Sequence, residues 1–134
     1  MARARNIKPK IMVNEQLADV DPFARLLFIY LWMLADREGR LEDRPKRIKA
    51  EALPYDHDVD VDALLDDLQV AGVLVRYFAK GVACIQILTF LEHQSPHQNE
   101  SPSVLPSVEE AEPVEATPGP VEGGFDTGTE DLAP

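Results

Sequence analysis

The sequence predicts an α+β domain of three helices followed by a β-hairpin, and three observations lead to this expectation. An apolar stretch with helix punctuation at both ends occupies residues 21–40. Two shorter stretches then repeat apolar residues at helical spacing, and two runs rich in β-branched and aromatic residues are joined by Lys80 and Gly81. Because helices and strands repeat about every 3.6 and 2 residues, this order of patterns defines the fold class.

The first helix is expected over residues 22–37. Asp21 can accept hydrogen bonds from the first turn, Pro22 suits the first helical position, and Gly39 can adopt the left-handed conformation that closes a helix. Residues 26–35 are apolar on every side, so this helix should be the central element. The preceding segment supplies apolar cover: Ile11, Val13, Leu17 and Val20. This cover favours burial within the domain, and a homodimer through the first helix is the alternative.

The stretch after this helix predicts a short strand and a second helix. Leu41 precedes a polar cluster and indicates a very short strand. Asp43 offers a cap, Pro45 falls in the first turn and Pro54 stops the chain, so a second helix is expected over residues 44–53. Its cationic side chains should point to solvent or lie near its flanks.

The third helix is expected over residues 60–71. Asp58 or Asp60 can cap it, and Gly72 ends its pattern. Its apolar side chains recur at i, i+3, i+4 and i+7: Val61, Leu64, Leu65 and Leu68.

Two strands, residues 73–79 and 82–89, complete the predicted domain as a tight hairpin. Helix, short strand, helix, helix and hairpin is the order of a winged helix-turn-helix domain. The predicted architecture is therefore a winged helix with three helices and a C-terminal β-hairpin.

Charge divides the chain into three parts. The 134 residues carry a formal net charge of -11, yet all 13 Lys and Arg residues lie before residue 101. We expect a basic N-terminal arm over residues 1–13, the winged helix domain over residues 14–100, and a disordered acidic tail over residues 101–134. The tail is rich in Pro and Gly and has few large apolar side chains, so burial cannot offset its ordering entropy.

The residue inventory argues against an enzyme. There is no glycine-rich phosphate loop with its lysine, and no Ser or Cys nucleophile has a base at a recognisable spacing. The single cysteine, Cys84, lies within a predicted strand and excludes an internal disulfide. No signal peptide is evident, and residues 26–35 are too short a run to cross a bilayer. We therefore expect a non-enzymatic protein of the bacterial cytoplasm that makes no membrane contact.

Neither a metal site nor a cofactor is predicted. The carboxylates around His57, at Asp58, Asp60 and Asp62, are better explained by the start of the third helix, where the macrodipole favours negative charge. His93 and His97 are four residues apart, but the proline between them argues against one helical face holding a metal.

The cations concentrate in two places, which predicts DNA binding. Positive charge gathers in the N-terminal arm and around the second helix, and the nearby acids are too few to neutralise it. Phosphate backbone is the commonest target of such a patch; a merely solvated face is the alternative. The predicted DNA-binding residues are Arg3, Arg5, Lys8, Lys10, Arg40, Arg44, Lys46, Arg47, Lys49 and Lys80. Binding should be sensitive to salt and have little sequence preference.

The third helix predicts a protein partner instead. In many winged helix proteins this helix enters the major groove between two lines of phosphates. Its outward side chains in this sequence are mainly carboxylates, which phosphates would repel. We therefore assign partner binding to Asp62, Asp66, Asp67 and Gln69.

Four segments resemble the N-terminal domain of bacteriophage and prophage replication proteins, the phage replisome organisers and related helicase-loading factors. They are RNIKP, NEQLADVDPFARLLFIYLWMLADREGRLEDRPKRIKAEALPYD, DVDALLDDL and IQILTFLEHQSPHQNESPS. The resemblance covers about residues 3–103, and LADREGRLEDRPKRIKAE is its most specific piece. It implies a winged helix fold, DNA binding near a replication origin, and contact with a replicative helicase or helicase loader of the host or phage.

The leading hypothesis is a phage DNA-replication accessory protein that binds DNA through its arm and second helix and recruits a replisome protein. An alternative is a protein adaptor or DNA-mimicking inhibitor acting through the acidic helix and tail. A further alternative, a winged helix transcriptional regulator, agrees poorly with an acidic third helix.

Overall fold

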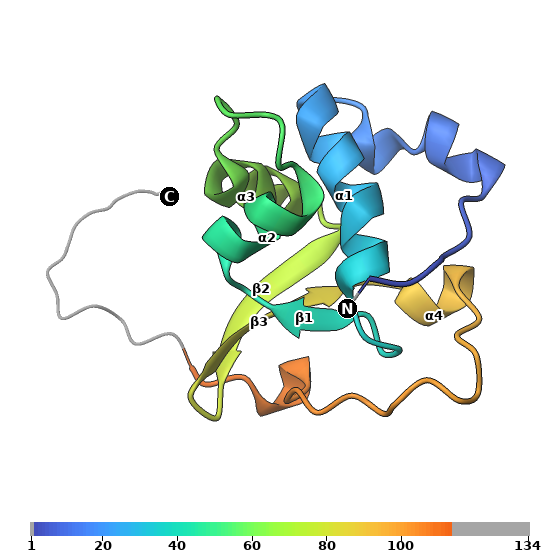
Figure 1. Cartoon of the computed structure of the whole chain (residues 1–134), viewed down its shortest axis with the longest axis vertical. Coiled ribbons are helices and arrows are strands. Elements are labelled where there is room, and N and C mark those ends of the chain that lie inside the picture. Colours follow the sequence, from blue (N-terminus) through green and yellow to red (C-terminus); the bar gives the residue numbers. More distant parts are fainter. Residues whose placement is uncertain (1, 114–134) are drawn as a thin grey trace, which may run out of the picture.

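The structure is a computed structural model that describes residues 2–113, and these residues form an α+β fold with four α-helices and a small antiparallel sheet. The chain runs through α1 (Pro22–Leu34), β1 (Arg40–Glu42), α2 (Pro45–Ala52), α3 (Val61–Val70), β2 (Leu74–Ala79), β3 (Val82–Ile87) and α4 (Phe90–His93) (Figure 1). Three short 3-10 helices are also present: η1 (Pro9–Val13), η2 (Glu15–Leu17) and η3 (Val108–Glu110). This order is compatible with the predicted winged helix.

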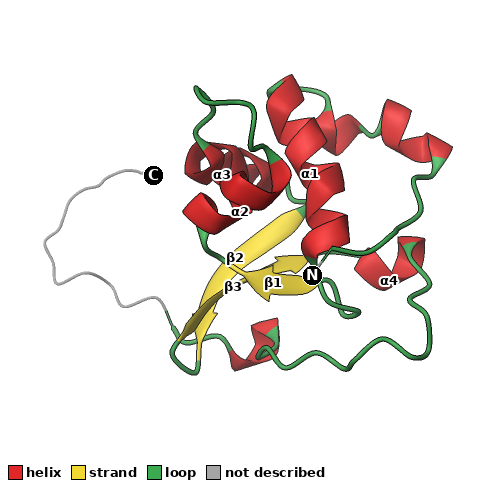
Figure 2. Ribbon diagram, viewed as in Figure 1, coloured by secondary structure: helices red, strands yellow, loops and turns green. Residues whose placement is uncertain are grey.

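The sheet has the order β1-β3-β2, with both pairs antiparallel. Helices α1, α2 and α3 gather on one side of it, whereas α4 lies at the far end of the sheet (Figure 2). Because β1 pairs with β3, the hairpin is joined to the segment between α1 and α2. The sheet therefore fixes where α2 begins.

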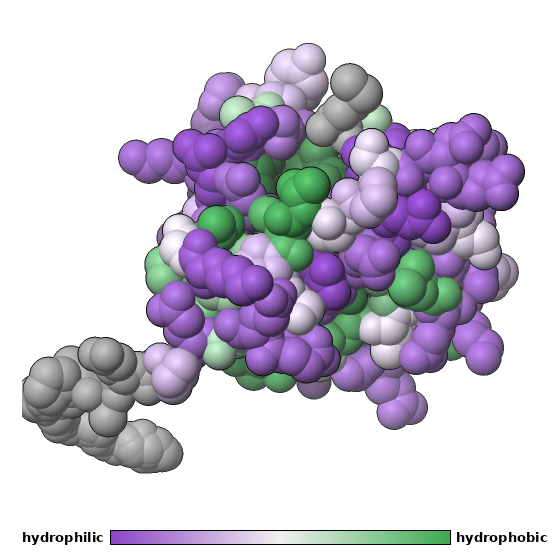
Figure 3. Space-filling view, turned by 90° about the horizontal axis from the view of Figure 1, so that it is seen from below, coloured by the Kyte–Doolittle hydropathy of each residue, from purple (hydrophilic) through white to green (hydrophobic). Residues whose placement is uncertain are grey.

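Helix α1 is the central element, as predicted. Ala24, Leu27 and Leu31 are fully buried in it, whereas the described chain covers part of the apolar run only partly: Leu26, Ile29, Tyr30, Met33 and Leu34. Leu17 is buried against the same core, but Val13 is exposed and its predicted role as cover is wrong. Seen from below, hydrophilic residues dominate the surface and apolar residues form separate small patches (Figure 3).

The end of α1 differs from the prediction. Asp21 caps the helix as expected, accepting from the amide of Phe23 at 2.7 Å. The helix ends at Leu34, before the predicted residue 37, because the carboxylate of Asp36 accepts from the amides of Glu38 and Arg40 in a turn of its own. Gly39 has a φ of 79°, so its left-handed conformation belongs to this turn and leads the chain into β1.

Helices α2 and α3 occupy the predicted positions to within a residue or two, but only one predicted cap is correct. Asp60 accepts from the amide of Ala63 at the start of α3. The residue at the start of α2 is Arg44, and no side chain caps this helix. The predicted cap Asp43 instead binds Arg76 of β2.

The hairpin is confirmed, with a two-residue turn at Lys80 and Gly81. Both residues have positive φ values, 51° and 80°. Two-residue hairpin turns of type I′ require this conformation, because their twist then matches that of the two strands. Strand β3 ends at Ile87 rather than at residue 89, because Thr89 has a φ of 56° and is the N-cap residue of α4.

The predicted N-terminal arm packs on the domain, and the predicted disordered tail needs correction within the described residues. Arg3 donates its backbone amide to the carbonyl of Met33, so the N-terminal segment is tied to α1. Residues 101–113 do not form a disordered tail: Tyr77 donates to the carbonyl of Pro106 at 2.6 Å, and Glu112 donates its amide to the carbonyl of Phe78 at 2.8 Å. An extended segment can satisfy its backbone on the edge strand β2 without a large apolar core. The rest of the predicted tail lies outside the described residues.

No helix in the described part of the chain has the length and apolar character needed to cross a membrane.

Candidate nucleic-acid interface

Helix α2 presents four cations on or beside its outer face. Pro45 fits the first turn, and Ile48 is buried against the core, which turns the opposite side of the helix to solvent. The four cations are Arg44, Lys46, Arg47 and Lys49. We call this set the α2 basic face.

Local acids hold two of these cations only loosely. Arg44 lies 3.6 Å from a carboxylate oxygen of Glu42, and Arg47 lies 3.9 Å from one of Glu51. The two arginines and their carboxylate partners are between 44% and 62% exposed, and exposed ion pairs at such distances contribute about 0–1 kcal/mol. A phosphate can therefore replace these carboxylates at little cost.

An open groove lies beside the α2 basic face. Arg44, Lys46 and Lys49 line it from α2, whereas Asp60 and Asp62 line it from the start of α3. The groove is thus basic on one wall and acidic on the other. A polyanion is attracted to the α2 wall and repelled by the α3 wall, which favours contact along the cations of α2 over deep insertion between the two helices.

Arg76 of β2 is the ion-pair partner of two of the carboxylates that make α3 acidic. Its guanidinium donates to both carboxylate oxygens of Asp43, at 2.7 and 2.9 Å. It also donates to Asp62 at 2.6 Å and to Asp66 at 2.7 Å. The hydrogen bond to Asp43 is the largest of the effects that raise the pKa of Arg76 above its ordinary value. One cation thus neutralises part of an acidic cluster drawn from two segments.

This network changes the predicted partner surface. Asp62 and Asp66 are bound to Arg76, and the side-chain oxygen of Gln69 accepts from the amide of Arg76 at 2.6 Å. Asp67 is exposed on the same helix. Three of the four predicted partner-binding side chains therefore help to join α3 to the sheet.

The N-terminal cations divide into two groups. The side chain of Arg5 is only 4% exposed; it binds Glu100 at 2.7 Å and lies over the ring of Phe90, 5.2 Å from its centroid. Arg3 donates to the carbonyl of Ala35 and lies 3.7 Å from Glu100. These arginines hold the N-terminal segment on the domain, and their predicted contact with DNA stays a prediction.

Lys8 and Lys10 are exposed, but they do not extend the α2 basic face. Their segment lies on the opposite side of α1 from α2 (Figure 1). The predicted arm and second helix are therefore separate surfaces.

The last two predicted DNA-binding residues lie on the sheet. Arg40 donates to the side-chain oxygen of Gln86 at 2.9 Å and is partly buried. Lys80, at the hairpin tip, lies 2.6 Å from a carboxylate oxygen of Glu110, whose pKa is lowered chiefly by this contact. Both cations have partners within the domain, and only the lysine remains well exposed.

Sequence reasoning missed Arg76 as the centre of the acidic cluster. A signal was present, since Arg76 is a lone arginine in an apolar strand that follows seven acids with no intervening base. Cys84 is fully buried, and burial raises the pKa of its thiol, as expected of an inert cysteine.

The described residues thus define a small α+β domain with an exposed basic helix beside a partly neutralised acidic helix. Comparisons with protein-family models, curated proteins and solved structures find no match to this chain.

Proposed function

We propose that the chain is a winged helix protein that binds DNA non-enzymatically through the α2 basic face. The observation that carries this proposal is the set of four cations on or next to α2, three of them exposed and Lys49 half-buried. Two have no described ion pair, and two have loose ones. The acidic side of α3 supports contact with the phosphate backbone over reading of base edges, since carboxylates are repelled from the major groove. Binding then has little sequence preference.

The salt dependence of DNA binding tests this proposal. With about four phosphate contacts, the logarithm of the association constant should fall with the logarithm of salt at a slope of about -3.6. The double variant Lys46→Gln/Lys49→Gln should make that slope shallower by about 1.8, because two contacts are lost. Fluorescence anisotropy with a short labelled duplex, over a series of salt concentrations, measures both slopes.

The control variant is Lys8→Gln/Lys10→Gln, which removes the same charge from the other side of α1. Its slope should equal that of the unmodified protein. Equal effects of the two variants would show that net charge, and not the α2 basic face, governs binding. Absence of salt-sensitive binding at low ionic strength would refute the proposal and leave the protein adaptor as the better interpretation.

We further propose a role in phage DNA replication, with a replicative helicase or its loader as the partner. This step depends on the resemblance of residues 3–103 to phage replication proteins. On α3, Asp67 and the 88% exposed Val70 give the partner an accessible surface beside the Arg76 network. Binding of purified bacterial replicative helicase to immobilised protein, and loss of binding in the variant Asp67→Lys/Val70→Glu, would support this role. Equal retention by both forms would exclude this surface.

A further inference from the structure

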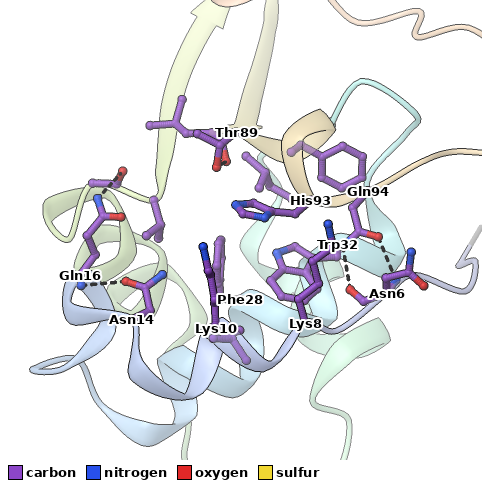
Figure 4. A pocket seen from close by; sticks show the side chains of 16 residues that line it. Asn6, Lys8, Lys10, Asn14, Gln16, Phe28, Trp32, Thr89, His93 and Gln94 are labelled. Atoms are coloured by element: carbon purple, nitrogen blue, oxygen red, sulfur yellow. Dashed lines mark hydrogen bonds between the residues drawn. The ribbon is translucent and has the colours of Figure 1, made fainter.

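A cavity of about 250 Å³ lies on the opposite side of α1 from the α2 basic face. The N-terminal segment, α1, the end of β3 and α4 enclose it (Figure 4). This volume is just below the range of roughly 300–1,000 Å³ typical of sites for drug-sized ligands. The cavity therefore suits a small molecule.

The floor of the cavity is aromatic. Phe28 and Trp32 of α1 pack edge to face, with centroids 5.4 Å apart and an interplanar angle of 76°. Val73, Ile87 and Phe90 add apolar walls. A planar ring can contact this floor and be removed from water in doing so.

The rim of the cavity is basic. Lys8, Lys10 and His93 are among the residues that line it, and no Asp or Glu is. Figure 4 shows the side chains of Lys10 and His93 directed into the open space above the aromatic floor. The chain as a whole has a net charge of -11, but the side chains that line this cavity include lysines and no carboxylate. The charge around the cavity is therefore positive, which favours an anionic ligand.

The wall around this rim is held in place by hydrogen bonds of its own. Gln94 is 5% exposed; its oxygen accepts from the amide of Asn6 and its nitrogen donates to the carbonyl of Asn6, both at 2.8 Å. Asn14 accepts from the amide of Gln16, also at 2.8 Å. Among residues 2–113, no hydrogen bond or ion pair uses the ammonium groups of Lys8 and Lys10. The cavity is therefore preformed, and its two lysines are available to a ligand.

We propose that this cavity binds a small aromatic anion. The ring lies against Phe28 and Trp32, and the anionic group accepts hydrogen bonds from Lys8 and Lys10 at the rim. A ligand with only one of these two parts binds more weakly, because it leaves either the aromatic floor or the ammonium groups without a partner. The site is separate from the α2 basic face, so the two proposals stand or fall independently.

Trp32 provides a direct readout of binding. It is the only tryptophan of the chain and forms part of the cavity floor. The full-length protein is titrated with phenylacetate while tryptophan fluorescence is recorded, with neutral phenylacetamide and cationic phenethylamine as matched ligands of nearly the same shape. We expect phenylacetate to bind with a Kd of about 1 mM, phenylacetamide about tenfold more weakly and phenethylamine more weakly still.

Lys8→Gln/Lys10→Gln should weaken phenylacetate binding about tenfold and leave the affinity for phenylacetamide unchanged. Both lysines are exposed, so the fold should be retained. Lys46→Gln/Lys49→Gln removes the same charge from α2 and should leave both affinities unchanged. Equal affinity for the three ligands, no fluorescence response, or an equal loss in both variants would overturn the proposal.

Two further titrations test the composition of the ligand. Acetate carries the charge without the ring and should not compete with phenylacetate; competition at equal concentration would contradict a role for the aromatic floor. Adenosine monophosphate combines a planar base with a phosphate. If adenosine monophosphate binds more tightly than phenylacetate, the natural ligand of the cavity is a nucleotide. If it binds more weakly, the natural ligand is a simple aromatic acid.

Discussion

Arg76 binds three carboxylates, two of them on α3. The strongest pairing is with Asp43, whose side chain is 10% exposed, whereas those of Asp62 and Asp66 remain mostly exposed. A buried ion pair is costly to break from one side, because the remaining charge is left without a partner. Arg76 therefore contributes to the fold mainly through Asp43.

Arg76→Ala should destabilise the domain by about 3 kcal/mol, because Asp43 is then left as an unpaired carboxylate in a largely buried position. Asp66→Asn, which removes an exposed member of the same network, should cost less than about 1 kcal/mol. Urea unfolding of both variants measures the difference. Equal stabilities would show that Asp43 does not depend on Arg76, whereas partial recovery in Arg76→Met/Asp43→Asn would support the pairing.

At the scale of the elements, the turn between α1 and β1 is held closely against α4. Gly39 has a φ of 79°, and a Cβ atom there would lie 2.6 Å from the Cβ of Phe90. The turn is therefore closed both by a left-handed backbone and by contact with α4. Gly81 has a nearly identical φ of 80° with no heavy atom within 4 Å of such a Cβ, so it isolates the backbone effect.

Gly39→Ala should destabilise the domain by more than about 2 kcal/mol, since both the left-handed conformation and the clash with Phe90 oppose the new methyl group. Gly81→Ala should cost about 1 kcal/mol, from the backbone alone. Thermal unfolding followed by circular dichroism gives the comparison. If the two variants unfold alike, the contact with α4 does not constrain the turn.

Element positions were largely predictable from the sequence because helix caps, prolines and apolar repeats are local signals. Asp21, Asp60 and the Lys80–Gly81 turn perform the predicted roles. Helix α4 was not predicted, and α1 and β3 end earlier than expected. Among the caps, the exception is a residue with a stronger partner elsewhere. Asp43 was expected to cap α2, but Arg76 holds it, and no local pattern contains that contact.

At the scale of the whole molecule, the N-terminal segment is joined to the segment that follows α4. Arg5 donates two hydrogen bonds to Glu100, at 2.7 and 3.1 Å, across a separation of 95 residues. These hydrogen bonds lower the pKa of Glu100 from its ordinary value of 4.5. A carboxylate with a lowered pKa in the folded state stabilises that state above the unfolded pKa, and this stabilisation is lost as pH falls through the folded value.

Glu100→Gln should therefore be less stable than the unmodified protein near neutral pH, by about 1.5 kcal/mol, and the difference should shrink as pH falls below about 4.5. Glu109→Gln, at an exposed position, serves as the control and should show no such difference. Urea unfolding at a series of pH values measures both. A Glu100→Gln difference that persists unchanged in acid would contradict the role of the Arg5–Glu100 pair.

The α+β class, the order of α1, β1, α2, α3 and the hairpin, and the exposure of Arg44, Lys46 and Arg47 were predicted from the sequence, because they follow from local repeats and caps. Helix α4 and the half-buried position of Lys49 were not predicted. Which cations have carboxylate partners depends on the tertiary structure. Arg5 binds Glu100, 95 residues away, and Arg76 binds carboxylates that lie between 10 and 33 residues away. The basic cavity is likewise formed where the N-terminal segment meets α4. Such contacts depend on how elements pack in space, so a pattern along the chain cannot specify them.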